Sequence, residues 1–126
     1  MLVVDEDLNK RLVGELRHRG RKTSGVRDLG LRGSDDQPLL RKIHSLFPDP
    51  VLITGDDHMP DDHAQLIEEL GATIATIAPC APQDPKEDQY EREIVHRWAH
   101  VMHTQPKGTR ERYSLNGHTK WKTRKR

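Results

Sequence analysis

Short apolar runs alternate with amphipathic segments along the first two thirds of the chain. Runs of Val, Leu, Ile and Ala at 2–4, 51–54 and 72–78 are bounded by turn residues and predict buried strands, with a shorter strand near 23–26. Between them, apolar residues at helical spacing predict helices over about 7–20, 35–47 and 61–70. This alternation is typical of a doubly wound α/β layer. We expect three layers, with about four parallel strands in the sheet.

Capping residues indicate where the first two helices begin and end. Asp7 is the expected N-cap of the first helix and Gly20 its C-terminal stop, while Ser34, Asp35 or Asp36 can cap the second helix. The second helix is expected to turn Leu46 inward just before two prolines terminate it. Both helices are therefore expected to dock on the sheet through one apolar face.

The pattern changes after residue 78. A proline-rich linker at 79–85 precedes an apolar stripe that predicts a fourth helix ending near residue 103. An Asn-Gly pair at 116–117 lies at the centre of a predicted hairpin. We therefore divide the chain into an α/β core at 1–78, a linker and amphipathic helix at 79–103, and a basic hairpin or tail at 104–126.

Composition limits the class of protein. The hydrophobic and charged fractions are both 33%, so part of the chain is expected to be solvated or bound to a partner. No apolar stretch has the length of a membrane span, and the single cysteine, Cys80, excludes an intramolecular disulfide. We expect a soluble cytoplasmic protein with no membrane partner.

Charge is unevenly distributed along the chain. Residues 1–103 hold 13 Lys and Arg against 19 Asp and Glu, a formal charge of −6, whereas residues 104–126 hold eight basic residues and one Glu, a charge of +7. A basic appendage on an acidic body can meet a phosphate backbone. The residues expected to bind nucleic acid, through phosphate contacts and base stacking, are Arg110, Arg112, Tyr113, Lys120, Trp121, Lys122 and Arg124.

Two other roles for the basic segment stay open. Tyr113 and Trp121 can staple the hairpin across its strands. The segment can also dock an acidic partner or a second subunit, which would make the protein a homodimer. Each role places the same side chains against a different surface.

Aspartates stand where the predicted strands end. Asp5 follows the run at 2–4, Asp56 follows the run at 51–54, and Asp36 lies at the start of the second helix. In a parallel sheet these positions meet at the carboxyl ends of the strands. Convergent carboxylates repel each other unless a cation lies between them, so the pattern predicts a site for Mg²⁺ or Mn²⁺. The alternative is that the acids only cap helices and turns.

Three motifs follow one another in this part of the chain: Val-Val-Asp-Glu-Asp-Leu at 3–8, Val-Arg-Asp-Leu-Gly-Leu-Arg-Gly-Ser-Asp-Asp at 26–36, and Leu-Ile-Thr-Gly-Asp at 52–56. In this order they resemble the short PIN-like domain family, which is related to the PIN nucleases and to VapC-type toxins. The resemblance covers about residues 1–78 and implies a PIN-like fold.

The resemblance also implies roles for particular residues. Asp5, Asp36 and Asp56 would be the catalytic carboxylates that hold the metal, with Glu6 in support. Thr54 would orient a carboxylate through its hydroxyl. The implied activity is metal-dependent cleavage of RNA by a toxin that an antitoxin protein neutralises, in which the ion lowers the pKa of a bound water and neutralises charge on the phosphate.

The chain departs from the family pattern at two places. Asp7 stands where the family typically has Asn, and His58 with Met59 replaces the second aspartate and the aromatic residue of a Thr-x-Asp-x-Asp-Phe motif. Asp57, beside the vacated position, or His58 itself could supply the missing ligand. These departures keep open a catalytically silent PIN-like module that binds RNA or protein.

A second resemblance is to the response-regulator receiver domain. The acids after the first strand and Asp56, followed three and four residues later by Met59 and Pro60, are similar to its phosphoacceptor site. A receiver needs a fifth strand ahead of a lysine, and no such apolar strand is evident. The Gly-Leu-Arg-Gly turn at 30–33 has no receiver counterpart. A receiver-like phosphoacceptor domain is therefore the alternative function.

Overall fold

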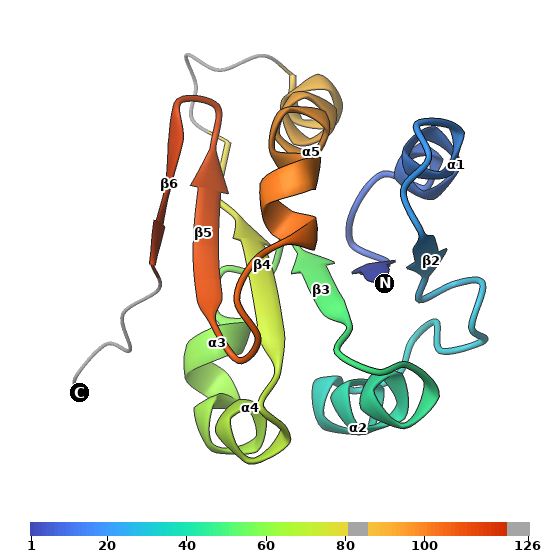
Figure 1. The fold of residues 1–126 in the computed structure, drawn as a ribbon, viewed down its shortest axis with the longest axis vertical. Helices are drawn as coiled ribbons and strands as arrows, with labels where there is room; N and C mark the ends of the chain where they lie inside the picture. The colour runs from blue at the N-terminus through green and yellow to red at the C-terminus, as the bar shows by residue number, and fades with distance from the viewer. Residues whose placement is uncertain (81–85, 121–126) are drawn as a thin grey trace.

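A single β-sheet organises the chain (Figure 1). The computed structural model describes residues 1–80 and 86–120, and in them the sheet has the order β2-β1-β3-β4-β5-β6. The first five strands in this order are parallel, and β6 is antiparallel to β5. The strands are β1 (Leu2–Val4), β2 (Thr23–Gly25), β3 (Val51–Thr54), β4 (Thr73–Ile77), β5 (Arg110–Ser114) and β6 (Gly117–Lys120).

Helices cover both faces of the sheet. They are α1 (Arg11–His18), α2 (Asp36–Leu46), α3 (Met59–Asp62), α4 (Ala64–Leu70) and α5 (Glu87–His103). Among the described residues, none of these helices has the length and apolar composition needed to cross a membrane.

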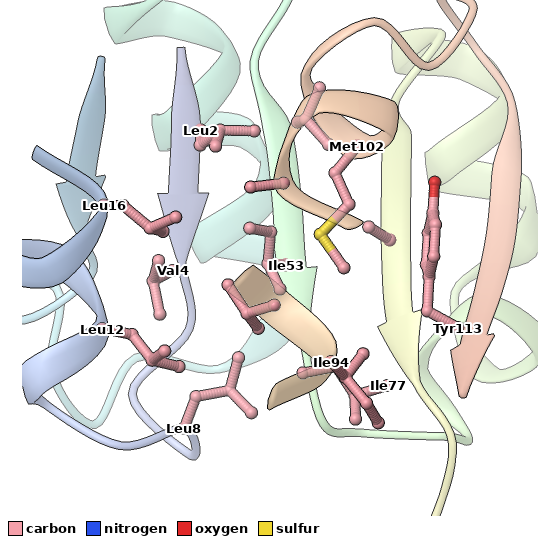
Figure 2. Packing of buried hydrophobic residues seen from close by; sticks show 14 of the residues in the cluster. Leu2, Val4, Leu8, Leu12, Leu16, Ile53, Ile77, Ile94, Met102 and Tyr113 are labelled. Atoms are coloured by element: carbon pink, nitrogen blue, oxygen red, sulfur yellow. The ribbon is translucent and has the colours of Figure 1, made fainter. Parts of the chain in front are cut away.

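The alternation of side chains along the strands builds two cores. Leu2 and Val4 on β1 pack with α1 and α5 (Figure 2), whereas Val3 between them packs with α2 and α4. Ile53 and Leu52 on β3 divide between the same two clusters. The expected three-layer α/β arrangement is confirmed.

The expected strand number was wrong. About four parallel strands are predicted from the sequence, but α5 is a crossover that returns the chain to the sheet as a fifth parallel strand, β5. The predicted hairpin is present as β5 and β6, joined by Leu115 and Asn116, and it extends the main sheet instead of forming a separate appendage. Only Tyr113 is buried on β5, so the segment lacks the apolar run that marks an internal strand.

Two helix boundaries also differ from expectation. Helix α1 begins at Arg11 with Lys10 at the N-cap position, so Asp7 does not cap the helix. Just before it, the Asn9 side chain accepts a hydrogen bond from the Arg11 N–H at 2.8 Å. The single helix expected at 61–70 is divided at His63 into α3 and α4. Helix α2 has the expected start, with Asp35 as N-cap, but Leu46 at its end is 44% exposed and does not face inward.

A buried polar group ties the crossover to the sheet. Tyr113 is fully buried, and its hydroxyl donates to Gln105 Oε1 at 2.9 Å. The Gln105 amide donates in turn to the carbonyl oxygens of Ile74 and Thr109, both at 2.9 Å. This network joins β4, β5 and the segment after α5, and it pairs the buried Tyr113 hydroxyl and the Gln105 amide.

We predict that Tyr113→Phe lowers the free energy of unfolding by about 1–3 kcal/mol, because Gln105 Oε1 loses its donor inside the core. Urea titration followed by circular dichroism measures the change. Thr119→Val, at an exposed position on β6, is the control. An unchanged free energy of unfolding in Tyr113→Phe contradicts the proposed importance of this network.

Candidate functional site

The strand order of the sheet reverses between β1 and β3, and we call the space beside the loops that follow their carboxyl ends the crevice. The chain leaves β1 through α1 toward β2 on one side, and leaves β3 through α3 and α4 toward β4 on the other. The loops after β1 and β3 therefore diverge, and ligands of doubly wound sheets bind at such a switch point. Asp5 and Asp7 follow β1, and Gly55 and Asp56 follow β3.

Thr54 links the two loops. Its hydroxyl donates to Asp5 Oδ2 at 2.8 Å and accepts from the backbone N–H of Asp56 at 3.1 Å. The other Asp5 oxygen, Oδ1, accepts from the backbone N–H of Glu6 at 2.8 Å. Asp5 is buried, so these donors hold its carboxylate in one orientation. Thr54 thus has the orienting contact that the sequence suggested.

Asp7 reaches across to the loop after β3. Its Oδ1 lies 3.4 Å from the backbone N of Gly55, a long hydrogen bond. A Cβ on Gly55 would stand 3.0 Å from Asp7 Oδ2, a distance that forces one of them to move. Glycine at position 55 is therefore what lets the Asp7 carboxylate approach the second loop.

Burial and mutual repulsion disfavour negative charge in the crevice. Burial raises the pKa of Asp5, and the charges of Asp36 and Glu6 raise it further, although hydrogen bonds from Thr54 and from the Glu6 N–H oppose this. The pKa of Asp7 is raised to about 6, first by burial and then by the charges of Asp5 and Asp56. Asp7 is thus close enough to Asp5 and to Asp56 for their charges to repel its own.

Acidic residues of α5 extend this edge. Burial and the charge of Glu87 raise the pKa of Glu91 to about 7, and Asp7 and Asp88 contribute to the same shift. The Asn9 side chain donates to Asp88, which ties the loop after β1 to the start of α5. An open hollow of about 620 Å³ lies between these segments and includes Asp7 and Glu91 in its lining.

The other predicted carboxylates have protein partners. Asp36 Oδ2 lies 3.1 Å from His63 Nε2. Glu6 turns toward the loop before α2, where its Oε1 accepts from the Gly33 N–H at 2.9 Å. Gly33 has a φ of +78°, which favours glycine at this turn. Asp36 and Glu6 therefore act on Asp5 through their charge, while their own oxygens bind elsewhere.

Of the two candidate replacements near position 58, Asp57 is paired within the protein and His58 is exposed. Asp57 forms an ion pair with Arg112 of β5, with Nε and Oδ1 at 3.2 Å and Nη2 and Oδ2 at 3.2 Å. His58 is exposed, and its backbone N–H donates to Asp56 Oδ1 at 3.0 Å. Asp57 thus fixes the loop after β3 to β5.

The donor chemistry of the crevice suits a hard divalent cation, since carboxylate oxygens are the ligands that Mg²⁺ and Mn²⁺ prefer. Within residues 1–80 and 86–120, however, no group of three or more His, Cys, Asp or Glu side chains is arranged to hold a metal ion. Mg²⁺ usually keeps several waters and binds through one or two carboxylates. Asp5, Asp7 and Asp56 therefore match the cation in ligand type without forming a three-ligand cage.

The structure gives two residues of the basic segment, Arg112 and Tyr113, contacts within the protein. Tyr113 lies in the core, so it cannot stack on a base at the surface, and its ring instead stacks on His118 across the hairpin at 5.3 Å. Arg112 is held by Asp57. Lys120 is exposed and Arg110 is half-buried. Trp121, Lys122 and Arg124 lie outside the described residues.

Asp7 is the site residue that the sequence interpretation missed. Its position just before an apolar periodic segment favoured a capping role, but the N-cap position of α1 is Lys10. The signal was its spacing from Asp5, because alternate residues after a strand can return to the same side. A glycine directly after the next strand, Gly55, was the matching signal of a close approach.

Comparison of the chain with protein-family models, curated proteins and solved structures finds no match. The assignment of a function therefore depends on the chemistry of the crevice.

We predict that Asp7→Asn stabilises the protein above pH 6 and not below pH 4. Folding raises the pKa of Asp7 from 3.8 to about 6, so wild-type stability falls as pH rises through this window and the loss is complete above it. The gain should stay below about 1 kcal/mol. The surroundings of Asp7 remove part of its hydration, but its side chain still contacts solvent, which screens its charge. Thermal melts of both proteins between pH 4 and 8 test this.

Asp62→Asn, at an exposed position on α3, controls for the loss of one negative charge. An equal gain in both variants, or a gain that does not depend on pH, contradicts the assignment of a raised pKa to Asp7.

Proposed function

We propose that the protein is a Mg²⁺- or Mn²⁺-dependent ribonuclease whose active site is the crevice after β1 and β3. The observation that carries this proposal is the crowding of Asp5, Asp7 and Asp56 at the switch point, where burial and repulsion raise the pKa of Asp5 and Asp7. A divalent cation between these carboxylates offsets their repulsion and favours their ionised form.

The residues of the crevice would have two roles, binding the ion and positioning its ligands. One or two of the carboxylates of Asp5, Asp7 and Asp56 would bind the ion. Thr54 hydrogen-bonds both the Asp5 carboxylate and the Asp56 backbone N–H and so fixes their relative positions. When bound, the ion supplies an activated water as the nucleophile and neutralises charge on the scissile phosphate. No cysteine or serine nucleophile is needed for this chemistry.

The choice of RNA as the substrate is supported by the three motifs that resemble short PIN-like domains. A role as the toxin of a toxin–antitoxin pair stays a prediction of the same resemblance. A catalytically silent protein would keep the fold and the acidic crevice but would show no metal-dependent cleavage.

We predict that Asp5→Asn and Asp56→Asn each reduce Mn²⁺-dependent cleavage of single-stranded RNA by more than about 100-fold, because even residues that support metal ligands contribute 10–100-fold. The assay uses a fluorescent oligoribonucleotide at limiting Mn²⁺. Asp49→Asn is a matched control, since Asp49 precedes β3 at the opposite edge of the sheet and Asn tolerates its φ of +49°.

Circular dichroism shows whether the variants fold. Full activity in both crevice variants overturns the proposed active site. Absence of cleavage in the wild-type protein with either metal favours the silent module.

A specific observation keeps the receiver domain as a second candidate. The order β2-β1-β3-β4-β5 is that of flavodoxin-like sheets, which include receiver domains, and the fifth parallel strand is present. Strand β5, however, ends at Ser114 and is followed by Leu115 and Asn116, so it does not lead to the lysine that would pair with an acyl phosphate. The topology thus favours this candidate and the residues count against it.

We predict that acetyl phosphate with Mg²⁺ does not phosphorylate Asp56, because that lysine is missing. Intact-mass spectrometry at neutral pH detects a stoichiometric phosphoryl adduct, and a known receiver domain provides the positive control. Stoichiometric labelling that Asp56→Asn abolishes would reverse the ranking of the two functions.

A further inference from the structure

Basic residues are concentrated on α1 and the turn that follows it. Residues 10–27 contain seven Lys and Arg and one acidic residue, Glu15, although residues 1–103 as a whole carry a charge of −6. Arg19 and Lys22 are exposed, and Arg21 is half-buried. Within the described part of the chain, the side chain of Arg19 has no hydrogen bond or ion pair. Its charge is therefore available to a ligand.

Helices α1 and α5 lie on the same face of the sheet and contact each other (Figure 1). A hollow lies beside them, lined by residues of α5 and by Arg19 just after the end of α1. Its volume is about 470 Å³, and its lining is Arg19, Gln89, Arg92, Glu93, His96 and Arg97. Arg92 Nε donates to Glu15 Oε1 at 3.1 Å, and His96 Nε2 lies 2.9 Å from the same oxygen. Glu15 is thus neutralised by its own neighbours. The charges of Arg19 and Arg97 together outweigh that of Glu93, so the hollow has a net positive charge.

The positive surface continues beyond the hollow toward the end of α5. Arg21 Nη1 lies 3.5 Å from His100 Nδ1. Burial lowers the pKa of His103, and the positive charges of the N-terminus, Arg21, His100 and Lys22 lower it further. Several positively charged groups therefore lie near His103, at the C-terminal end of α5.

Helices α1 and α5 both begin at the edge that carries the carboxylate crevice and run away from it. We propose that the hollow beside α1 and α5 binds the phosphate backbone of a single-stranded polynucleotide that extends from the crevice. The identity of the ligand rests on the proposed ribonuclease function. Arg side chains bind phosphate through paired N–H donors. An exposed, positively charged groove of this kind contacts the phosphate backbone without selecting a particular base.

The test measures binding without cleavage. A fluorescein-labelled oligouridylate is titrated with protein in EDTA at several salt concentrations, and anisotropy reports the affinity. Arg19→Glu/Arg21→Glu reverses two charges of the basic surface, and Arg41→Glu/Lys42→Glu reverses two exposed charges on α2 on the other face of the sheet.

The first double variant is expected to weaken binding at least tenfold and to reduce the slope of log affinity against log salt by about 1.4, from two phosphate contacts at roughly 0.7 each. The α2 variant should bind like the wild-type protein. Equal losses in both variants, or no loss in the first, overturn the proposal. Competition by polyglutamate as strong as that by oligouridylate also overturns it, in favour of an acidic protein partner.

Failure of this proposal and failure of the ribonuclease function are distinguishable. Binding that depends on Arg19 and Arg21 without Mn²⁺-dependent cleavage supports the backbone surface and refutes the nuclease. If the double variant cleaves RNA with an unchanged KM, the result supports the nuclease function and refutes this binding surface.

Discussion

The repulsion among carboxylates at the carboxyl ends of β1 and β3 is the constraint on which the rest of the structure depends. A buried Asp5 is stable only with its two hydrogen-bond donors, and one of them, Thr54, is the last residue of the neighbouring strand. The same threonine accepts from the Asp56 N–H, so the register of β1 and β3 sets the geometry of both acids. Packing in the two cores holds this register against the repulsion.

Much of the parallel sheet could be predicted because its inner strands are apolar on both faces. Leu2, Val3 and Val4 are all buried, and a run of this kind is visible in the sequence. Once β1 and β3 are located, the positions of Asp5 and Asp56 follow from the topology of parallel sheets. The layers and the acidic crevice were therefore accessible without coordinates.

The features that could not be predicted from the sequence depend on contacts between residues that lie far apart along the chain. Strand β5 shows one buried side chain, Tyr113, among charged neighbours, and its place in the sheet is set by pairing with β4 and by Gln105. The pairing of Arg112 with Asp57 joins residues 55 positions apart, so charge counting assigned this arginine to a ligand. The role of Asp7 depends equally on the missing side chain at Gly55.

The ion pair between Asp57 and Arg112 affects the order in which the protein folds during its synthesis on the ribosome. Translation proceeds from the N-terminus, and early segments fold before later ones emerge. The loop after β3 is anchored by Arg112, which lies 55 positions further along the chain than its partner Asp57. Its final arrangement must therefore wait until β5 has been synthesised and has left the ribosome, well after the residues of the crevice have emerged.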